Sequence, residues 1–335
     1  MKRELRVDYV QSQRDIRSCF EDNPKSKFSV FDNGILLEEE PENYSRYTDT
    51  SEVDMLEVKL GTNIITHKDP RKGIYNMKCI SEDLKRLMKE KPTILVSSGA
   101  IGLGRDARLK KGELIPESEA NAPEQKRQDA IEGQFLLYTL WENHFYPLET
   151  EEFLITHDDI RYEQKSKELL RRYEKCLSSG TISVTNEKDK ESLEEIEILM
   201  NGERVFRDND ELASLIARLL KDAGYNPMLI LLSNTDGIYT KESYKNRKYE
   251  PIRVVKNSKG LENHAIPVCS TRGRGGMISK IGAAREAAEE GIYTVIADGQ
   301  YWKHEDAQRK YDVLDSILEG RVVGTRFLPV DYFLR

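Results

Sequence analysis

The chain has 335 residues, of which 38% are hydrophobic and 33% charged, and its net charge is −7 at neutral pH. No segment approaches the ~18 consecutive apolar residues of a membrane-spanning helix. Residues 1–10 are charged and lack the apolar core of a signal peptide. The negative charge argues against general nucleic-acid binding. We therefore expect a cytoplasmic protein with no membrane and no nucleic-acid partner, built as one or two α/β domains.

The cysteines and histidines give no sign of a disulfide framework or a metal centre. Cys19, Cys79, Cys176 and Cys269 lie far apart in the sequence, which suits a reducing compartment. The five histidines form no HExxH or His-x-His pair. We interpret them as structural or solvent-exposed residues.

The first 55 residues differ in pattern from the rest. Residues 28–31 and 35–37 flank Asn33-Gly34, a sequence typical of a tight β-hairpin turn. An acidic run and a polar stretch follow. We predict an N-terminal extension over residues 1–55, with a hairpin and a linker or surface arm, followed by one domain over residues 56–335.

After residue 55, short apolar strands alternate with helical patterns. This alternation predicts a mainly parallel sheet covered by helices on both faces, in which ligands bind beyond the carboxyl ends of the strands. A second hairpin is expected around Asn201-Gly202, and Asp208 is the expected N-cap of a helix that ends at Gly224. Strands are predicted at 56–60, 93–96, 153–155, 181–184, 228–232 and 293–297, and other helices at 76–90, 124–145, 166–177 and 276–290.

Glycines follow several of these strands, and a further group precedes the helix predicted at 276–290. Any one of them is explained by a tight turn, but together they favour loops whose backbone N–H groups approach an anion. The motifs of P-loop enzymes, of dinucleotide-binding folds and of protein kinases are all missing. The glycines in question are Gly61, Gly99, Gly102, Gly104, Gly237, Gly273, Gly275 and Gly276.

Two lysines are candidates for binding such an anion. Lys59 lies one residue from the end of the first core strand, and lysine is seldom buried without a reason. The alternative is a lysine on an edge strand that points to solvent. Lys280 lies in the first turn of the helix after Gly276 and can reach an anion at the helix start, or it can be a surface lysine.

Eight segments taken in order resemble the amino-acid kinase superfamily and, within it, the glutamate 5-kinases. They cover about residues 56–328. The resemblance implies an α/β/α sandwich around a mainly parallel sheet. The segments are KLGTN (59–63), VSSGAIG (96–102), THDDIR (156–161), NEKD (186–189), RDNDELA (207–213), LLSNTDGIYT (231–240), GRGGMISK (273–280) and VGTRF (323–327).

The resemblance also implies roles by position. Lys59 and Lys280 would be catalytic and contact the phosphates of ATP. Ser98, Asp189 and Asn209 would hold glutamate as substrate. Mg²⁺ would arrive with ATP, and Asp208 or Asp210 is a further candidate for orienting it. The implied nucleotide contacts are Lys59, Gly61, Ser233, Asn234, Arg274, Gly275, Gly276, Met277, Ile278, Ser279 and Lys280.

Several departures from the family pattern bear on the acceptor. Lys188 stands where Asn is usual, Asn234 stands where Asp is common, and the segment between Asp189 and Asn209 is longer than usual. Other acceptors therefore stay open, namely aspartate, carbamate, a phosphonate or a nucleoside monophosphate, as does a sensor without turnover. The RNA-binding-like C-terminal (PUA) domain of many bacterial members is not expected, because the sequence ends soon after residue 327. A homo-oligomer and functional hand-off to a glutamyl-phosphate reductase are expected.

Overall fold

The computed structural model describes residues 27–67, 69–113, 122–188, 208–241, 245, 250–266, 276–304 and 312–334. The hairpin expected around Asn201-Gly202 lies outside these ranges, as do the predicted site residues Asp189, Arg274 and Gly275. None of the helices in the described ranges combines the length and the apolar sequence needed to cross a bilayer.

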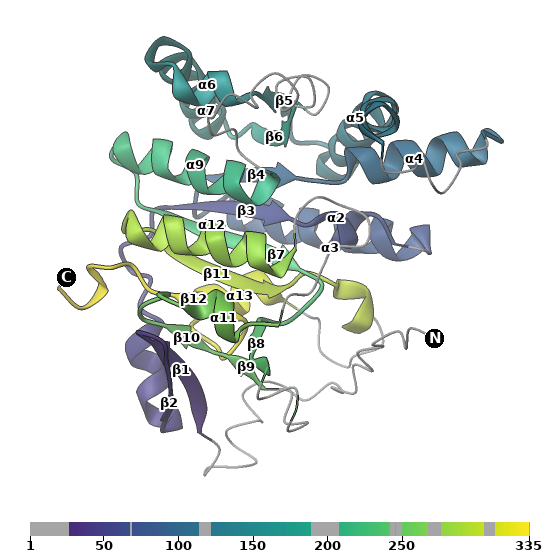
Figure 1. Ribbon diagram of the computed structural model, residues 1–335. Coiled ribbons are helices and arrows are strands. Elements are labelled where there is room, and N and C mark those ends of the chain that lie inside the picture. The colour runs from purple at the N-terminus through teal and green to yellow at the C-terminus, as the bar shows by residue number, and fades with distance from the viewer. Residues whose placement is uncertain are drawn as a thin grey trace, which may run out of the picture.

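A ten-stranded sheet forms the middle of the molecule, in the order β2-β1-β10-β12-β11-β7-β3-β4-β6-β5 (Figure 1). From β11 to β5 all neighbours are parallel. β12 is antiparallel to β11, and β10 and β1 follow the direction of β12. The strands are β1 Phe28–Asp32, β2 Ile35–Glu39, β3 Met55–Leu60, β4 Thr93–Ser97, β5 Thr150–Ile155, β6 Ile182–Glu187, β7 Pro227–Ser233, β10 Val254–Val255, β11 Tyr293–Asp298 and β12 Thr325–Phe327, with β8 Ile238–Tyr239 and β9 Pro251–Ile252 as a separate pair.

Helices cover both faces of the sheet, which confirms the three-layer α/β/α sandwich. One apolar cluster joins the sheet to α2 Thr62–Ile65, α3 Pro70–Leu87, α5 Pro123–Phe145 and α13 Val313–Leu318. The second joins it to α7 Glu163–Ser179, α9 Asn209–Asp222, α11 Leu261–His264 and α12 Met277–Glu289. α9 and α12 lie side by side on this second face (Figure 1). The remaining elements are α4 Ala100–Lys110, α6 His157–Arg161 and the 3₁₀ turns η1 Pro41–Tyr47, η2 Tyr301–His304 and η3 Tyr332–Leu334.

β3 occupies the centre of the sheet between β7 and β4. Its residues Leu56, Val58 and Leu60 pack in the first cluster. Because successive side chains of a strand alternate between faces, Glu57 and Lys59 face the second layer, which holds α9 and α12. The side chain of Lys59 is only 3% exposed, so the alternative of a solvent-facing edge lysine is wrong.

The N-terminal segment adds strands to this sheet. β1 and β2 pair antiparallel across Asn33-Gly34, both of which have positive φ, and β1 pairs with β10. Arg326 of β12 is fully buried and donates hydrogen bonds to the hydroxyl of Tyr44 at 3.0 Å and that of Tyr293 at 3.2 Å. Residues 28–47 therefore pack against the body of the fold. A domain boundary at residue 55 stays a prediction.

The glycines after β4 have a different role from the one the sequence suggested. α4 begins at Ala100, directly after Gly99, so Gly102 and Gly104 lie inside a helix. A Cβ on Gly104 would lie 1.8 Å from the carbonyl oxygen of Asp129, and one on Gly133 would lie 1.8 Å from that of Ala100. These two glycines let α4 and α5 approach closely, and Gly102 leaves room for the side chain of Thr66.

Candidate active site

Two lysines and one aspartate form a buried ionic cluster at the carboxyl end of β3. Lys59 Nζ lies 2.5 Å from Asp210 Oδ1, and Lys280 Nζ lies 2.9 Å from Asp210 Oδ2 and 3.2 Å from Oδ1. All three side chains are at most 7% exposed. Lys59 comes from the central strand, Lys280 from the first turn of α12 and Asp210 from the first turn of α9.

Burial and the neighbouring charges shift the pKa values of Asp210 and Lys59. Burial alone would raise the pKa of the Asp210 carboxyl, but the ammonium groups of Lys280 and Lys59 outweigh burial and hold that pKa below its ordinary value. The pKa of Lys59 is lowered, chiefly because its ammonium is buried, with Asp210 opposing the shift and Lys280 adding to it. Asp210 is therefore ionised. Asp208 adds a second carboxylate close enough to act on Lys59, so the two ammonium groups lie among two carboxylates.

Consecutive side chains at the start of α9 contact three other elements. Asp208 is the N-cap, as predicted, and its Oδ1 accepts the backbone N–H of Asp210 at 2.9 Å and of Glu211 at 3.2 Å. Its other oxygen accepts a hydrogen bond from Ser279 of α12. Asn209 turns to β6, and Asp210 binds Lys59 of β3.

The described residues that were expected to contact the nucleotide come from elements next to this cluster. A Cβ on Gly61 would lie 3.8 Å from Lys280 Nζ, so Gly61 is directly beside that ammonium. Ser233 ends β7, the strand next to β3, and is followed by Asn234. Gly276 is the N-cap of α12 and, having no side chain, supplies no cap to the first N–H groups of this helix. Ile278 is 42% exposed on the same turn.

The two expected acceptor residues that the structure describes come from different elements. Ser98 follows β4, is buried, and its backbone N–H donates to Leu60 O at 3.2 Å. The neighbouring Ser97 accepts a hydrogen bond from Trp141 Nε1 at 2.8 Å. Asn209 lies at the start of α9, next to Asp210. Ser98 and Asn209 thus approach the lysine pair from different elements.

The acidic side chains around the ionic cluster are the candidate metal ligands at this site. The described residues contain no group of three or more His, Cys, Asp or Glu side chains placed to hold a metal ion. Both oxygens of Asp210 accept from lysine ammonium groups, and both oxygens of Asp208 accept from N–H or O–H donors. Both aspartates are therefore already engaged by donors in this arrangement, and their remaining lone pairs can accept from a metal-bound water.

Asn209 is hydrogen-bonded to a line of polar side chains that were not singled out from the sequence. Asn209 contacts Asn186, which contacts Gln134, which contacts Glu152. Asn186 lies within the NEKD segment, but sequence patterns gave it no role of its own. Gln134 and Glu152 stand on α5 and β5, and no local pattern predicts that they meet.

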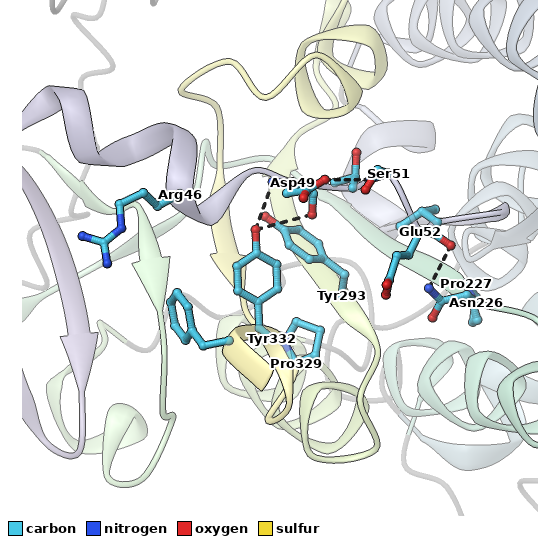
Figure 2. Close-up of a pocket in the computed structure, with 12 residues that line it drawn as sticks. Arg46, Asp49, Ser51, Glu52, Asn226, Pro227, Tyr293, Pro329 and Tyr332 are labelled. Atoms are coloured by element: carbon cyan, nitrogen blue, oxygen red, sulfur yellow. Dashed lines mark hydrogen bonds between the residues drawn. The ribbon is translucent and has the colours of Figure 1, made fainter. Parts of the chain in front are cut away.

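A separate pocket of about 310 Å³ lies at the opposite edge of the sheet (Figure 2). Pro227 and Tyr293 stand at the amino ends of β7 and β11 and line it. The Asp49 backbone N–H donates to the Tyr332 hydroxyl at 2.9 Å there. Since the lysine pair lies at the carboxyl end of β3, this pocket is not part of the candidate active site.

The fold and the family match define a class of protein. An α/β/α sandwich with a buried lysine pair at the strand ends is compatible with binding of an anionic group. Residues 56–298 match the profile of the amino acid kinase family. The chain belongs to this family, and it is a kinase of that class.

Particular relatives carry the comparison further. A glutamate 5-kinase of Clostridium perfringens is 30% identical over 279 residues, which are 81% of this chain and 94% of that protein. A glutamate 5-kinase of Symbiobacterium thermophilum is 32% identical over 273 residues, again 81% and 94%. The solved structure of isopentenyl phosphate kinase from T. acidophilum aligns with a TM-score of 0.49 and 15% identity, over 82% of this chain and 99% of that one. A structural likeness at this level bears on neither acceptor nor nucleotide.

Proposed function

We propose that the protein transfers the γ-phosphoryl group of ATP to the γ-carboxylate of L-glutamate and forms glutamyl 5-phosphate, the first step of proline biosynthesis. The observation that carries the phosphoryl-transfer part is the convergence of Lys59 and Lys280 on Asp210 at the carboxyl end of β3. The choice of glutamate rests on the relatives that are named glutamate 5-kinase.

The chemistry suits a site without a general base. A glutamate side chain has a pKa of about 4.3 in water and is already ionised at pH 7. One carboxylate oxygen bonds to the γ-phosphorus while the bond to the β–γ bridging oxygen breaks, and ADP leaves with that oxygen. The main obstacle is repulsion between anions, about 4 kcal/mol for a pair of unit charges ~4 Å apart at an effective dielectric constant of ~20. Positive charge at the reacting phosphate lowers that cost.

The roles of individual residues follow from their positions. Lys59 and Lys280 would contact the phosphates, together with the first N–H groups of α12 after Gly276. Ser233 and Asn234 would contact the nucleotide. Glutamate would lie between Ser98 and Asn209, with Asp189 as its third contact. Mg²⁺ would accompany ATP and neutralise phosphate charge.

Hydroxylamine trapping tests the proposed reaction. Acyl phosphates react with hydroxylamine, so protein supplied with ATP, Mg²⁺ and glutamate should give γ-glutamyl hydroxamate. We expect Lys59→Ala to lower kcat at least ~100-fold, because it removes a cation aimed at the transferring group. Lys110→Ala, which changes an exposed lysine of α4, serves as the matched control.

Three results would contradict parts of the proposal. A hydroxamate from another acid but none from glutamate would show that the acceptor is wrong. Near-normal kcat in Lys59→Ala would remove Lys59 from the chemistry, provided that urea unfolding shows the variant to be folded. Binding of ATP and glutamate in calorimetry without ADP release would favour a sensor.

The proposed product also implies a partner. An acyl phosphate hydrolyses readily, so a reductase that acts on glutamyl phosphate is the expected next enzyme. A homo-oligomer stays a prediction, to be tested by sedimentation.

A further inference from the structure

A continuous line of hydrogen bonds runs from α9 through β6 and α5 to β5. Asn209 Nδ2 donates to Asn186 Oδ1 at 2.9 Å, Asn186 Nδ2 to Gln134 Oε1 at 2.7 Å, and Gln134 Nε2 to Glu152 Oε1 at 2.9 Å. The backbone N–H of Glu187 donates to Asn209 Oδ1 at 3.0 Å. Asn186 is 1% exposed and Asn209 8%, so the Asn209 end of this amide chain is shielded from water.

The groups at both ends of the amide chain require its hydrogen bonds to be donated in the same direction, from Asn209 toward Glu152. A backbone N–H can only donate, so Glu187 requires the oxygen of Asn209 to face it. An ionised carboxylate can only accept, so Glu152 requires the NH₂ group of Gln134 to face it. Each amide between them must then donate toward Glu152. A reversed side-chain amide anywhere in the line would place two donors or two acceptors against each other.

This direction decides what Asn209 can offer to a ligand. Its Nδ2 carries two hydrogens, and only one is used by Asn186 among the described contacts. The second N–H is a donor, which is the group that recognises a carboxylate oxygen. Asn209 also precedes Asp210, whose carboxylate binds both lysines, so the amide is one residue from the charged centre. A flipped amide would offer an oxygen there and repel a carboxylate.

We propose that Gln134 and Glu152 are positioning residues that orient the amide of Asn209, so that it presents an N–H donor to the carboxylate acceptor. The proposal rests on the proposed function in that the acceptor is a carboxylic acid. It goes beyond the assigned contacts, because neither Gln134 nor Glu152 is placed to touch the substrate. Their effect passes through Asn186.

Substitutions of equal size test the direction of the amide chain. In Gln134→Glu, the new carboxylate can still accept from Asn186, but its second oxygen faces the Glu152 carboxylate and repels it. We expect the acceptor KM to rise about tenfold, the loss expected for a misplaced hydrogen bond to a charged group. The kcat and the KM for ATP should stay within about twofold, because the lysine pair is unchanged.

The double variant Gln134→Glu/Glu152→Gln should reverse the defect. Gln at position 152 can donate to Glu at position 134, which accepts at both ends, so every bond regains its direction. We expect the acceptor KM to return to within about twofold of the starting value. Glu152→Gln alone keeps an acceptor oxygen for Gln134 and should raise KM less than Gln134→Glu does. Glu149→Gln, an exposed neighbouring change, is the control.

The double-mutant cycle separates a positioning role from a structural one. Urea unfolding of all variants measures any loss of stability. The proposal is overturned if folded Gln134→Glu keeps its acceptor KM, if kcat and both KM values change together, or if the double variant fails to restore KM. The substrate is first fixed with unaltered protein: if that protein turns over another carboxylic acid but not glutamate, glutamate is wrong and the cycle is run with the active acid. If it turns over no carboxylic acid, both proposals fail.

Discussion

Glu57 is a carboxyl group buried in the middle of β3. Its side chain is fully shielded from solvent, and neither oxygen has a hydrogen-bond partner among the described residues. Its strand neighbours on that face are Ile94 and Leu229. Burial raises the pKa of Glu57 well above its ordinary value. Burial therefore favours the neutral form of this side chain, which lies two residues before Lys59.

This burial makes stability depend on pH. Because the pKa of Glu57 is higher in the folded than in the unfolded protein, protonated Glu57 contributes to the free energy of unfolding. This contribution is complete below the unfolded-state pKa, about 4.3, and is lost as pH rises through the folded-state pKa. Glu57→Gln removes the titration. From pH 5 upward we expect the unfolding free energy of the unaltered protein to fall relative to this variant, by at most about 1.4 kcal/mol per pH unit.

Urea unfolding at a series of pH values measures this difference. Glu90→Gln changes an exposed carboxylate, and its unfolding free energy should depend on pH in the same way as that of the unaltered protein. If the unfolding free energy of Glu57→Gln also follows that pH dependence, the fold does not raise the pKa of Glu57.

For individual residues, the sequence predicts fewer of the contacts than the structure shows. The position of Lys59 at a strand end could be read from its neighbours, and Asp208 as an N-cap from local spacing. The role of Asp210 could not, because its partner Lys59 lies 151 positions away. The contacts of Gln134 with Asn186 and Glu152 likewise depend on tertiary packing, and side-chain amides carry no periodic signal.

Among the secondary-structure elements, the α4–α5 pair shows how glycine can mislead. Glycine lowers helix propensity, so Gly102 and Gly104 suggested a loop. The helix forms nevertheless, because these positions permit contacts that a larger residue would prevent. Elements with strong apolar periodicity, such as α9 and α12, were predicted nearly to their ends. α3 starts at Pro70 rather than at 76, since Asp69 caps it through the backbone N–H of Arg71.

We predict opposite effects for two Gly→Ala changes within helices. Gly104→Ala should destabilise the protein by about 3 kcal/mol, since its Cβ would lie 1.8 Å from the Asp129 carbonyl oxygen. At Gly282→Ala in α12 the new Cβ would meet no atom of another described element within 4 Å, and the change should stabilise the protein by about 0.5 kcal/mol. Denaturant midpoints measure both. Equal effects at the two sites would show that close packing of α4 on α5 is not the reason for Gly104.

For the whole molecule, the mainly parallel sheet with two helical layers followed from the alternation of elements. The change of direction at β12 did not. β10 and β12 have only two and three residues, too few for a periodic pattern. Their pairing also joins β1, from the first part of the chain, to the centre of the sheet.

Arg326 connects this N-terminal part to the rest, and its removal should loosen that part first. Arg326→Met leaves the hydroxyls of Tyr44 and Tyr293 without their donor, at a cost of about 3 kcal/mol. We expect faster amide hydrogen exchange in residues 28–47 than in α9. Arg218→Met, which removes an exposed ion pair, should change neither the stability nor the exchange rates of residues 28–47. Uniform acceleration across the protein would instead mean that the two parts unfold together.

The first turn of α9 has a thermodynamic consequence. Asp208, Asn209 and Asp210 contact α12, β6 and β3, and a rigid helical turn cannot move one of them alone. If nucleotide binding shifts this turn, the affinity for the acceptor changes as well. Linkage then requires that the acceptor change the nucleotide dissociation constant by the same factor. Isothermal titration of each ligand, with and without the other, would give that single coupling constant from two directions.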